Sequence, residues 1–540
     1  MKKFSFYLLF CAGLLAPSLS FSQSDYTAPK EMKARLQKIV SKYPSMAKME
    51  SIAKTPSSNE VLAVTLGVGD VANHPAIAVV AGVDPRHLVG VETSLQLVED
   101  FLSREDAEQF LSKNTFYIFP CVNPDATEGF FGDLKYESAL TKSLYDNDRD
   151  GLMSEDGVDD LNGDGIISSM IVETAGGEYI KHPDDNRVII KADAAKGEKG
   201  KYKLFSEGKD NDDDGLINED GVDGVSLNRN FTYKFKNWGA QSGDYPVSEV
   251  ENRALLDFMY NAFNIHTVVA LGVNDNMAEA PKYTNKTRKG VDLPKSADSE
   301  NMLLDADNAL ATLVSEIYKT NNPKSNNILA ETPLDGNFME WAYYHYARNS
   351  FATTVWSVDQ KDSRDSREAA YLKWADKNGV KDCYTEWSVV EHPDFEGETV
   401  ELGSINPYAM YTPSLELIDD QIDATIKTIS DIAALSPNIV LNVSTTEISK
   451  GVYRVVAKVV NDGAIATTTA LGEKSYLVKY VRVELKLNGQ KMVQGTRITT
   501  IPSLKAGGAE ELSFIVEGKG SFELEVGSPQ SGYVSKTVSL

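Results

Sequence analysis

The chain has 540 residues and is too long for one ordinary domain, so two or three domains are expected. Hydrophobic residues make up 42% and charged residues 25%, a globular composition with ample material for a large core. The formal net charge of −25 argues against nucleic acid or an anionic membrane surface as a partner and favours cations or basic ligands.

Residues 1–22 have the pattern of a secretory signal peptide: a charged start, an apolar stretch and small residues before a cleavage point near Ser22. No later run is long enough to span a membrane. The protein is therefore expected to be exported to the periplasm or the medium. Cys121 and Cys383 remain after cleavage, and two buried free thiols are favoured over a disulfide.

Residues 23–435 alternate short apolar runs with amphipathic helices, which is typical of an α/β domain. Apolar residues between Leu88 and Leu102 recur at helical spacing. Ser248 and Glu251 predict a capping box that opens a helix through Phe263. The runs that predict buried strands are 61–66, 76–82, 116–120, 267–271 and 351–356.

Residues 436–540 change to the two-residue period of strands, as in 451–460 and 480–487. Shorter strands are expected at 513–516 and 522–526, and Asn488-Gly489 predicts a hairpin turn. This segment is interpreted as a small β-sandwich. It carries no identifiable chemistry, so an accessory packing or attachment module is expected.

An acidic insertion, residues 146–223, contains a repeated D-x-D-x-D-G sequence and a shorter relative between the two copies. Three carboxylates on one side of a tight loop are the hard oxygen ligands that Ca²⁺ requires, and calcium is favoured over solvated acidic turns. The candidate calcium ligands are Asp146, Asp148, Asp150, Glu155, Asp160, Asn162, Asp164, Asp210, Asp212, Asp214 and Glu219.

Several short motifs follow one another along the α/β domain. A turn at 84–87 follows an apolar run and opens a helix, residues 123–125 read N-P-D, residues 228–231 read N-R-N-F, and residues 243–249 read G-x-x-P-x-S-E. In this order and spacing the motifs resemble those of the M14 family of zinc carboxypeptidases. The resemblance extends from residue 26 to about 407.

The resemblance implies an α/β fold with a mixed, eight-stranded-type sheet flanked by helices, here followed by the small β-sandwich. It also implies a centre in which two His and one Glu hold Zn²⁺, which polarises the scissile carbonyl and lowers the pKa of the attacking water. A separate Glu would act as general base, and an Asn-Arg pair would hold the terminal carboxylate of the substrate.

The positions that match the metal ligands and the base have changed in this chain. Asp84 and His87 stand in place of the first His and the Glu, and the second His position falls on Gly272. The general-base position falls on Thr354, whose hydroxyl does not take up a proton near neutral pH. Asp84 and His87 are therefore candidate zinc ligands only in a degenerate site.

Two interpretations remain open for Asp84 and for the Asn228-Arg229 pair. An Asp followed by Pro at a helix start is an N-cap, which is favoured for Asp84 over metal binding, although Asp and His are competent ligands. Asn228 and Arg229 match the substrate-binding pair and are expected to bind a peptide or another carboxylate-bearing ligand. Pairing of Arg229 with the acidic loops is the alternative.

The favoured hypothesis is an exported M14-like protein without peptidase activity that keeps a carboxylate-binding pocket and calcium-binding loops. One alternative is an active zinc carboxypeptidase with a rearranged metal site, which requires a third ligand near Asp84 and His87. The other is a calcium-stabilised surface adhesion module.

Overall fold

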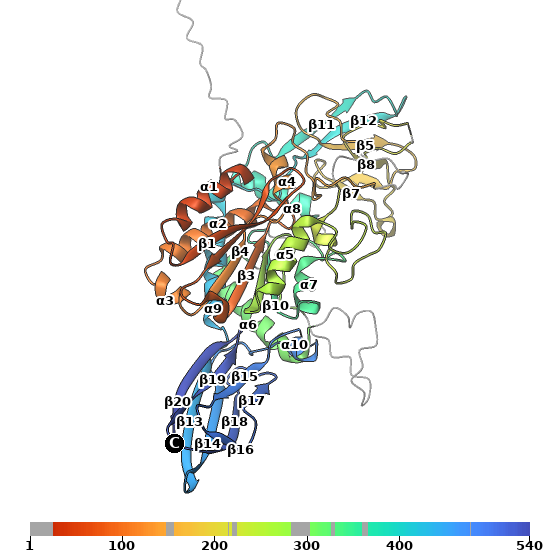
Figure 1. Cartoon of the computed structure of the whole chain (residues 1–540). Helices are drawn as coiled ribbons and strands as arrows, with labels where there is room; N and C mark the ends of the chain where they lie inside the picture. The colour runs from red at the N-terminus through yellow and green to blue at the C-terminus, as the bar shows by residue number, and fades with distance from the viewer. Residues whose placement is uncertain are drawn as a thin grey trace, which may run out of the picture.

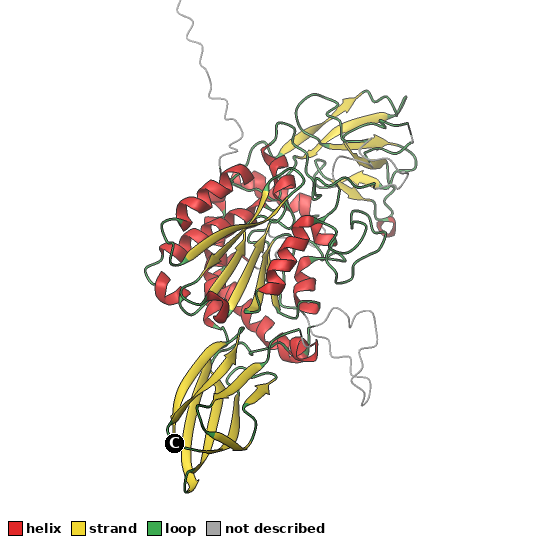
Figure 2. Ribbon diagram, in the orientation of Figure 1, coloured by secondary structure: helices red, strands yellow, loops and turns green. Residues whose placement is uncertain are grey.

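The structure is a computed structural model. It describes residues 25–146, 156–213, 215–218, 224–281, 303–325, 330–358, 366–475 and 477–540. The expected signal peptide lies outside these residues. The described chain has three parts: a central α/β layer structure, a second sheet at one end of it, and a C-terminal pair of sheets at the other end (Figures 1 and 2).

The central sheet has the strand order β1-β2-β4-β3-β9-β10. The strands are β1 (Ala47–Lys54), β2 (Glu60–Leu66), β3 (Ala76–Ala81), β4 (Thr115–Phe119), β9 (Ile265–Leu271) and β10 (Asn349–Thr353). The neighbours from β4 to β10 are parallel, whereas β1 and β2 pair antiparallel. The predicted mixed sheet is confirmed, with six strands in the described part of the chain where an eight-stranded type was expected.

Helices cover both faces of this sheet. One core joins the sheet to α1 (Pro29–Val40), α2 (Leu88–Ser103), α3 (Ala107–Leu111), α6 (Asp305–Asn321), α8 (Arg367–Asn378) and α9 (Asp419–Ala434), and the other joins it to α5 (Val250–Asn261) and α7 (Phe338–Tyr344). In β3, Ile77 and Val79 face the first core, and Ala78 and Val80 face the second. Because both faces are buried, such strands are continuous apolar runs, which is why the sequence predicted them well.

Short elements connect these layers. They are α4 (Pro124–Thr127) and the 3₁₀ turns η1 (Val71–Asn73), η2 (Glu128–Phe131), η3 (Ala194–Lys196), η4 (Leu227–Arg229), η6 (Pro323–Ser325) and η7 (Leu415–Leu417). Of these, α4 and η4 carry the N-P-D and N-R-N-F motifs. Asn123 caps α4, because its Oδ1 accepts a hydrogen bond from the Ala126 amide at 3.2 Å.

The second sheet, in the order β11-β12-β5-β8-β6-β7, was not predicted. Its strands are β5 (Ser169–Glu173), β6 (Tyr179–Lys181), β7 (Ile189–Lys191), β8 (Tyr202–Ser206), β11 (Tyr384–Val390) and β12 (Thr399–Ile405). Four of them lie inside the acidic insertion. They have three to five residues each, too few to show a clear alternation, and β5 also pairs with β12, which follows more than two hundred residues later.

The C-terminal segment is a β-sandwich, as predicted. One sheet has the order β13-β14-β18-β16 and the other β17-β15-β19-β20. The elements are β13 (Ile439–Ser449), β14 (Val452–Asn461), α10 (Ala470–Ser475), β15 (Val481–Lys486), β16 (Lys491–Gln494), β17 (Ile498–Ile501), β18 (Ala509–Glu517), β19 (Ser521–Ser528) and β20 (Gly532–Ser539).

The hairpin predicted at Asn488-Gly489 is wrong. β15 pairs with β17 and β19, whereas β16 pairs with β18, so this turn carries the chain from one sheet to the other. Val481, Val483 and Leu485 of β15 are fully buried between the sheets. Burial of this apolar face decides the pairing, and the local turn preference does not.

Polar contacts join the sandwich to the α/β part. Asp307 of α6 accepts hydrogen bonds from the Ala470 amide at 2.8 Å and the Leu471 amide at 3.4 Å. His266 of β9 bonds through Nε2 to the Ser436 hydroxyl at 3.1 Å. Its burial lowers the pKa of His266 to about 3. This histidine therefore belongs to the contact between the two parts and lies at the opposite end of β9 from Gly272.

Cys121 and Cys383 are free thiols, as predicted, but only Cys121 is buried, and Cys383 is partly exposed. Burial raises the pKa of Cys121 to about 12, so its side chain is a neutral thiol. Among the helices in the described ranges, none combines the length and the apolar character needed to cross a bilayer.

Helix α5 begins where predicted, but the capping box is wrong. The N-cap residue is Glu249 and makes no side-chain capping bond, while the Ser248 hydroxyl donates to Glu249 Oε1 at 2.8 Å. Glu251 is fully buried, and neither of its carboxyl oxygens has a hydrogen-bond partner among the described residues. Burial, together with the negative charges of Glu249 and Asp125, raises the pKa of Glu251 to about 7.

We expect Glu251→Gln to stabilise the protein in a pH-dependent way. The folded-state pKa of Glu251 lies above the unfolded value of 4.5, so the stability that comes from its proton is complete below 4.5 and is lost as the pH rises through about 7. A glutamine stays neutral and avoids this loss. Its free energy of unfolding should exceed that of the wild type by about 2 kcal/mol at alkaline pH and match it under acidic conditions.

Urea denaturation at the two pH values measures the difference. Glu108→Gln, on the exposed side of α3, is the matched control and should leave the free energy of unfolding unchanged at both alkaline and acidic pH. An effect of Glu251→Gln that is the same at both pH values would contradict the buried, protonated carboxyl.

Candidate functional site

The carboxyl ends of three parallel strands bring together the residues chosen from the sequence. Asp84 and His87 follow β3, Gly272 follows β9, and Thr354 follows β10. The carboxyl ends of parallel strands meet at one edge of a sheet, and ligand sites of open α/β sheets lie at that edge. The four positions therefore lie at one place in the fold, although they are far apart in the sequence.

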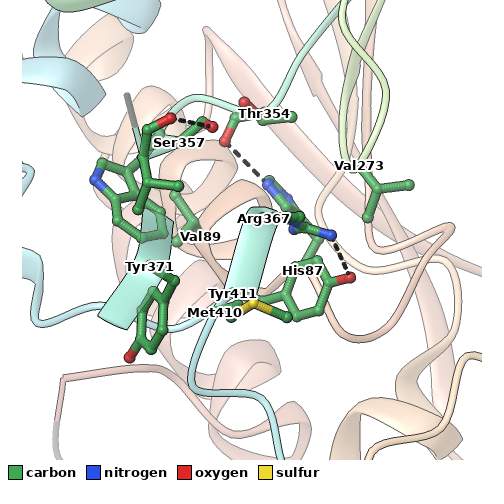
Figure 3. A pocket seen from close by; sticks show the side chains of 11 residues that line it. His87, Val89, Val273, Thr354, Ser357, Arg367, Tyr371, Met410 and Tyr411 are labelled. Atoms are coloured by element: carbon green, nitrogen blue, oxygen red, sulfur yellow. Dashed lines mark hydrogen bonds between the residues drawn. The ribbon is translucent and has the colours of Figure 1, made fainter. Parts of the chain in front are cut away.

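Two cavities lie at this edge. The first, which we call the Asn228 cavity, has a volume of about 320 Å³ with its opening included and is lined by Asp84, Asn228 and Gly272 among others. The second, the Trp356 cavity, measures about 390 Å³ on the same basis and is lined by His87 and Thr354 (Figure 3).

Asp84 does not cap the helix; it binds Arg86. Its carboxylate accepts hydrogen bonds from the Arg86 backbone amide at 3.1 Å, from Nε at 2.9 Å and from Nη2 at 2.6 Å. Burial acts to raise the pKa of Asp84, but the charge and hydrogen bonds of Arg86 outweigh it and hold the pKa below its usual range. The N-cap prediction is wrong because α2 begins at Leu88, where His87 is the capping residue.

His87 uses both ring nitrogens inside the protein. Nδ1 accepts a hydrogen bond from the Gly90 amide at 3.2 Å, so Nε2 carries the hydrogen and donates to the Thr354 carbonyl at 3.0 Å. Burial lowers the pKa of His87 to about 4, which keeps the ring neutral. Neither nitrogen has a lone pair free for a metal in this arrangement.

Arg86 connects these residues to a larger group of charged side chains, the Arg86 cluster. Its members are Asp84, Arg86, Glu137, Glu331, Arg367 and Tyr411. Nη2 of Arg86 lies 3.2 Å from Glu331 Oε2, and Nη1 of Arg367 donates to Glu331 Oε1 at 3.0 Å. The Tyr411 hydroxyl also donates to Glu331. The Glu331 carboxylate is thus held by two guanidinium groups and a phenol.

Aromatic packing and charge balance complete the Arg86 cluster. The guanidinium carbons of Arg86 and Arg367 lie 4.9 and 4.6 Å from the centroid of the Tyr411 ring. Burial raises the pKa of Glu137, whose Oε2 accepts from the Tyr408 amide at 2.7 Å. The positive charges of Arg86 and Arg367 are balanced chiefly by the negative charges of Asp84 and Glu331.

The residues at this edge do not fit a zinc ion. Zinc sites need three protein ligands with free donor atoms. Asp84 is bound to Arg86 and His87 to Gly90 and Thr354, while Gly272 has no side chain to offer. Within the described residues, no group of three or more His, Cys, Asp or Glu side chains is placed to hold a metal ion.

Of the predicted carboxylate-binding pair, Asn228 lines the Asn228 cavity, whereas Arg229, the next residue in the chain, is not among its lining residues. Asn228 Nδ2 donates to Asn274 Oδ1 at 3.2 Å, and its Oδ1 accepts from the Phe338 amide at 3.0 Å. One amide hydrogen of Asn228 remains for a ligand. The half-buried Arg229 side chain pairs with no described residue, so pairing with the described part of the acidic loops is absent.

The acidic loops are described only in part. Asp148, Asp150, Glu155, Asp214 and Glu219 lie outside the described residues; Asp146, Asp160, Asn162, Asp164, Asp210 and Asp212 lie within them. Oδ1 of Asp160 accepts from the Gly163 amide at 2.7 Å and Oδ2 from the Gly165 amide at 2.8 Å. This loop is therefore a tight turn around one carboxylate, and calcium binding stays a prediction.

Sequence reasoning missed most of the Arg86 cluster. Arg86 stood within the motif at 84–87 but was given no role, and nothing local marked Glu331, Arg367 or Tyr411. These residues are separated by up to 325 positions along the chain and meet only through the fold. An unexplained arginine between two altered ligand positions was the one available signal.

We expect Glu331→Ala to destabilise the protein, because it leaves Arg86 and Arg367 partly buried with a shared acceptor removed. The free energy of unfolding should fall by about 2 kcal/mol. Urea or thermal denaturation measures it. Asp376→Ala removes an acceptor of Arg187 from an exposed ion pair and is the matched control, with an expected change below about 0.5 kcal/mol. Equal effects of the two variants would mean that the Arg86 cluster contributes nothing beyond a surface pair.

Comparisons with known proteins agree with this architecture. The sequence profile of zinc carboxypeptidases (peptidase M14) matches residues 32–154 and 194–365, and residues 439–539 match a domain of unknown function (DUF8731). No curated protein matches the chain.

Solved structures that resemble the chain are carboxypeptidases and related proteins. Bovine thrombin-activatable fibrinolysis inhibitor, in complex with tick carboxypeptidase inhibitor, is 13% identical over 76% of this chain and 96% of its own, with a TM-score of 0.39. Carboxypeptidase A from Helicoverpa armigera is 11% identical over 76% and 73%, also with a TM-score of 0.39. The family assignment rests on the profile, which matches more than half of the residues, and the chain belongs to the zinc carboxypeptidase family.

Proposed function

We propose that this member of the family binds the terminal carboxylate of peptides without hydrolysing them. One observation carries the proposal: the donor atoms of Asp84 and His87 are already used by Arg86, Gly90 and Thr354. A zinc ion placed there would have to break these bonds and would still lack a third ligand.

A rearranged metal site is disfavoured by the positions of the remaining histidines. Of the six histidines in the chain, His87 alone lines either cavity. His266 bonds to Ser436, and His392 bonds to the Gly208 carbonyl at 2.8 Å. At the general-base position, Thr354 offers a hydroxyl that cannot accept a proton near neutral pH.

The binding half of the proposal rests on Asn228 and Arg229. The Arg229 guanidinium has no partner among the described residues and directly follows a residue that lines a small cavity, which suits it to a bidentate contact with a carboxylate. The Asn228 cavity has apolar walls, among them Val80, Phe338 and Met339, against which a side chain of the ligand would pack. This combination favours an apolar C-terminal residue over a charged one.

The test compares an N-acetylated tripeptide that ends in phenylalanine with its C-terminal amide. We expect the free carboxylate to bind and the amide to bind at least about tenfold more weakly, because the charge-assisted contact to Arg229 is lost. Arg229→Ala should reduce the affinity for the acid by a similar factor and leave that for the amide unchanged. Isothermal titration calorimetry measures the four affinities.

Arg454→Ala, on an exposed position of β14, is the matched control and should bind the acid as the wild type does. The same samples are incubated with zinc, and bound metal and released phenylalanine are measured. Stoichiometric zinc with release that a chelator abolishes would overturn the proposal in favour of an active enzyme. Equal binding of acid and amide would overturn the carboxylate site and favour the adhesion module.

Export and calcium binding form the second part of the proposal. The N-terminal pattern supports cleavage near Ser22, which the mass of the native protein checks. Outside the cytoplasm, loops of modest affinity meet enough calcium to be filled. Asp156 supports a shared function of the repeats, because its buried carboxylate accepts from the Asn211 amide at 3.1 Å and from the Asn218 amide at 2.6 Å, linking the first repeat to the second.

We expect calcium to raise the thermal unfolding midpoint in a saturable way, because binding to the folded state alone stabilises it. Magnesium should have a smaller effect, since it demands stricter octahedral geometry. Scanning calorimetry with chelator, calcium or magnesium measures the shift. Identical midpoints in all three conditions would contradict calcium-binding loops.

A further inference from the structure

The Trp356 cavity is separate from the carboxylate site proposed above. The two cavities share only Val273 among the residues that line them. The Trp356 cavity lies between the end of β10 and α8, with Arg367 and Tyr411 from the Arg86 cluster at its wall (Figure 3). Neither the proposed peptide contact nor the internal charge balance uses its interior.

Two polar groups at this cavity have unused hydrogen-bonding capacity. Arg367 donates only from Nη1, to Glu331 at 3.0 Å and to the Tyr411 hydroxyl at 2.9 Å, and its Nε and Nη2 have no acceptor among the described residues. The Thr354 hydroxyl is buried, and it too has no partner in the described part of the chain. Buried polar groups are normally hydrogen-bonded, so the Thr354 hydroxyl points to a ligand, and the partly exposed Arg367 side chain has two nitrogens left to donate to the same ligand.

The remaining walls are apolar and held in place by packing. Trp356 is 6% exposed and Tyr371 2% exposed, and both rings contact Trp374, at centroid distances of 5.0 and 5.9 Å. Val89 and Met410 also line the cavity. An apolar cavity with a few convergent polar groups is the usual form of a small-molecule site.

We propose that the Trp356 cavity binds a small carboxylate with a short aromatic or apolar body. The carboxylate accepts hydrogen bonds from Nε and Nη2 of Arg367 and from the Thr354 hydroxyl. The body of the ligand packs against Trp356 and Tyr371. Glu331 remains on Nη1 of Arg367, so the ligand does not need to displace the internal carboxylate.

The test uses benzoate as the probe, with benzamide as its neutral counterpart and acetate as a carboxylate without a body. Binding is followed by tryptophan fluorescence and by the thermal unfolding midpoint. We expect saturable binding of benzoate, at least about tenfold weaker binding of benzamide and a weaker response to acetate. Absence of saturable benzoate binding, or equal binding of benzamide, would overturn the proposal.

Two variants locate the probe. Thr354→Val removes the hydroxyl but keeps the backbone carbonyl that His87 uses, and it should weaken benzoate binding about fivefold. Trp356→Phe should remove most of the fluorescence response and keep the thermal shift. If Thr354→Val leaves the affinity unchanged, the assignment to this cavity is wrong.

Arg229→Ala distinguishes binding in the Trp356 cavity from binding at the proposed peptide site, because Arg229 is not among the residues that line the Trp356 cavity. Benzoate binding should be unchanged in this variant, whatever happens to peptide binding. If Arg229→Ala abolishes benzoate binding and Thr354→Val leaves it unchanged, benzoate binds at the peptide site. That result would overturn the proposal for the Trp356 cavity and leave the proposed peptide site standing.

Discussion

The ion pairs of the Arg86 guanidinium are the interaction on which the cleft of this protein depends. Arg86 lies between Asp84 and Glu331, and Arg367 supports Glu331 from a second direction. In a zinc carboxypeptidase, a metal ion supplies the positive charge at such a site. In this chain, Arg86 brings a guanidinium, which is permanently charged, to Asp84 and Glu331.

The central sheet does not depend on these charged residues for its stability. The strands are held by burial on both faces, in cores that lie below the edge where the charged residues meet. Loops after the strands carry Asp84, Gly272 and Thr354, so these positions can change while the strands stay. The same edge therefore keeps its two cavities, and each has its own polar groups and walls.

The sequence predicted helices and strands well where the local pattern of apolar residues agreed with their burial in the fold. The runs that became β2, β3 and β9 are apolar because both sheet faces are covered, and α2 has its apolar residues at helical spacing. Predictions failed where tertiary packing opposed a local preference. Glu251 is buried instead of closing a capping box, and the turn at Asn488-Gly489 joins two sheets instead of two paired strands. In the second sheet, the strands of the insertion are too short to be recognised locally, and β5 pairs with β12 across more than two hundred residues.

The sequence by itself indicated the family and the α/β domain followed by a sandwich, and it predicted that Asp84, His87 and Gly272 stand at the family's metal-ligand positions. Those conclusions need only motif order, periodicity and residue identity. Only the tertiary structure decided which contacts the side chains at these positions make. It pairs Asp84 with Arg86, uses both nitrogens of His87, and brings Glu331 and Arg367 to the same point. Hydrogen bonds and ion pairs act over a few ångströms, so side chains separated by hundreds of residues interact only once the sheet has placed its strand ends together.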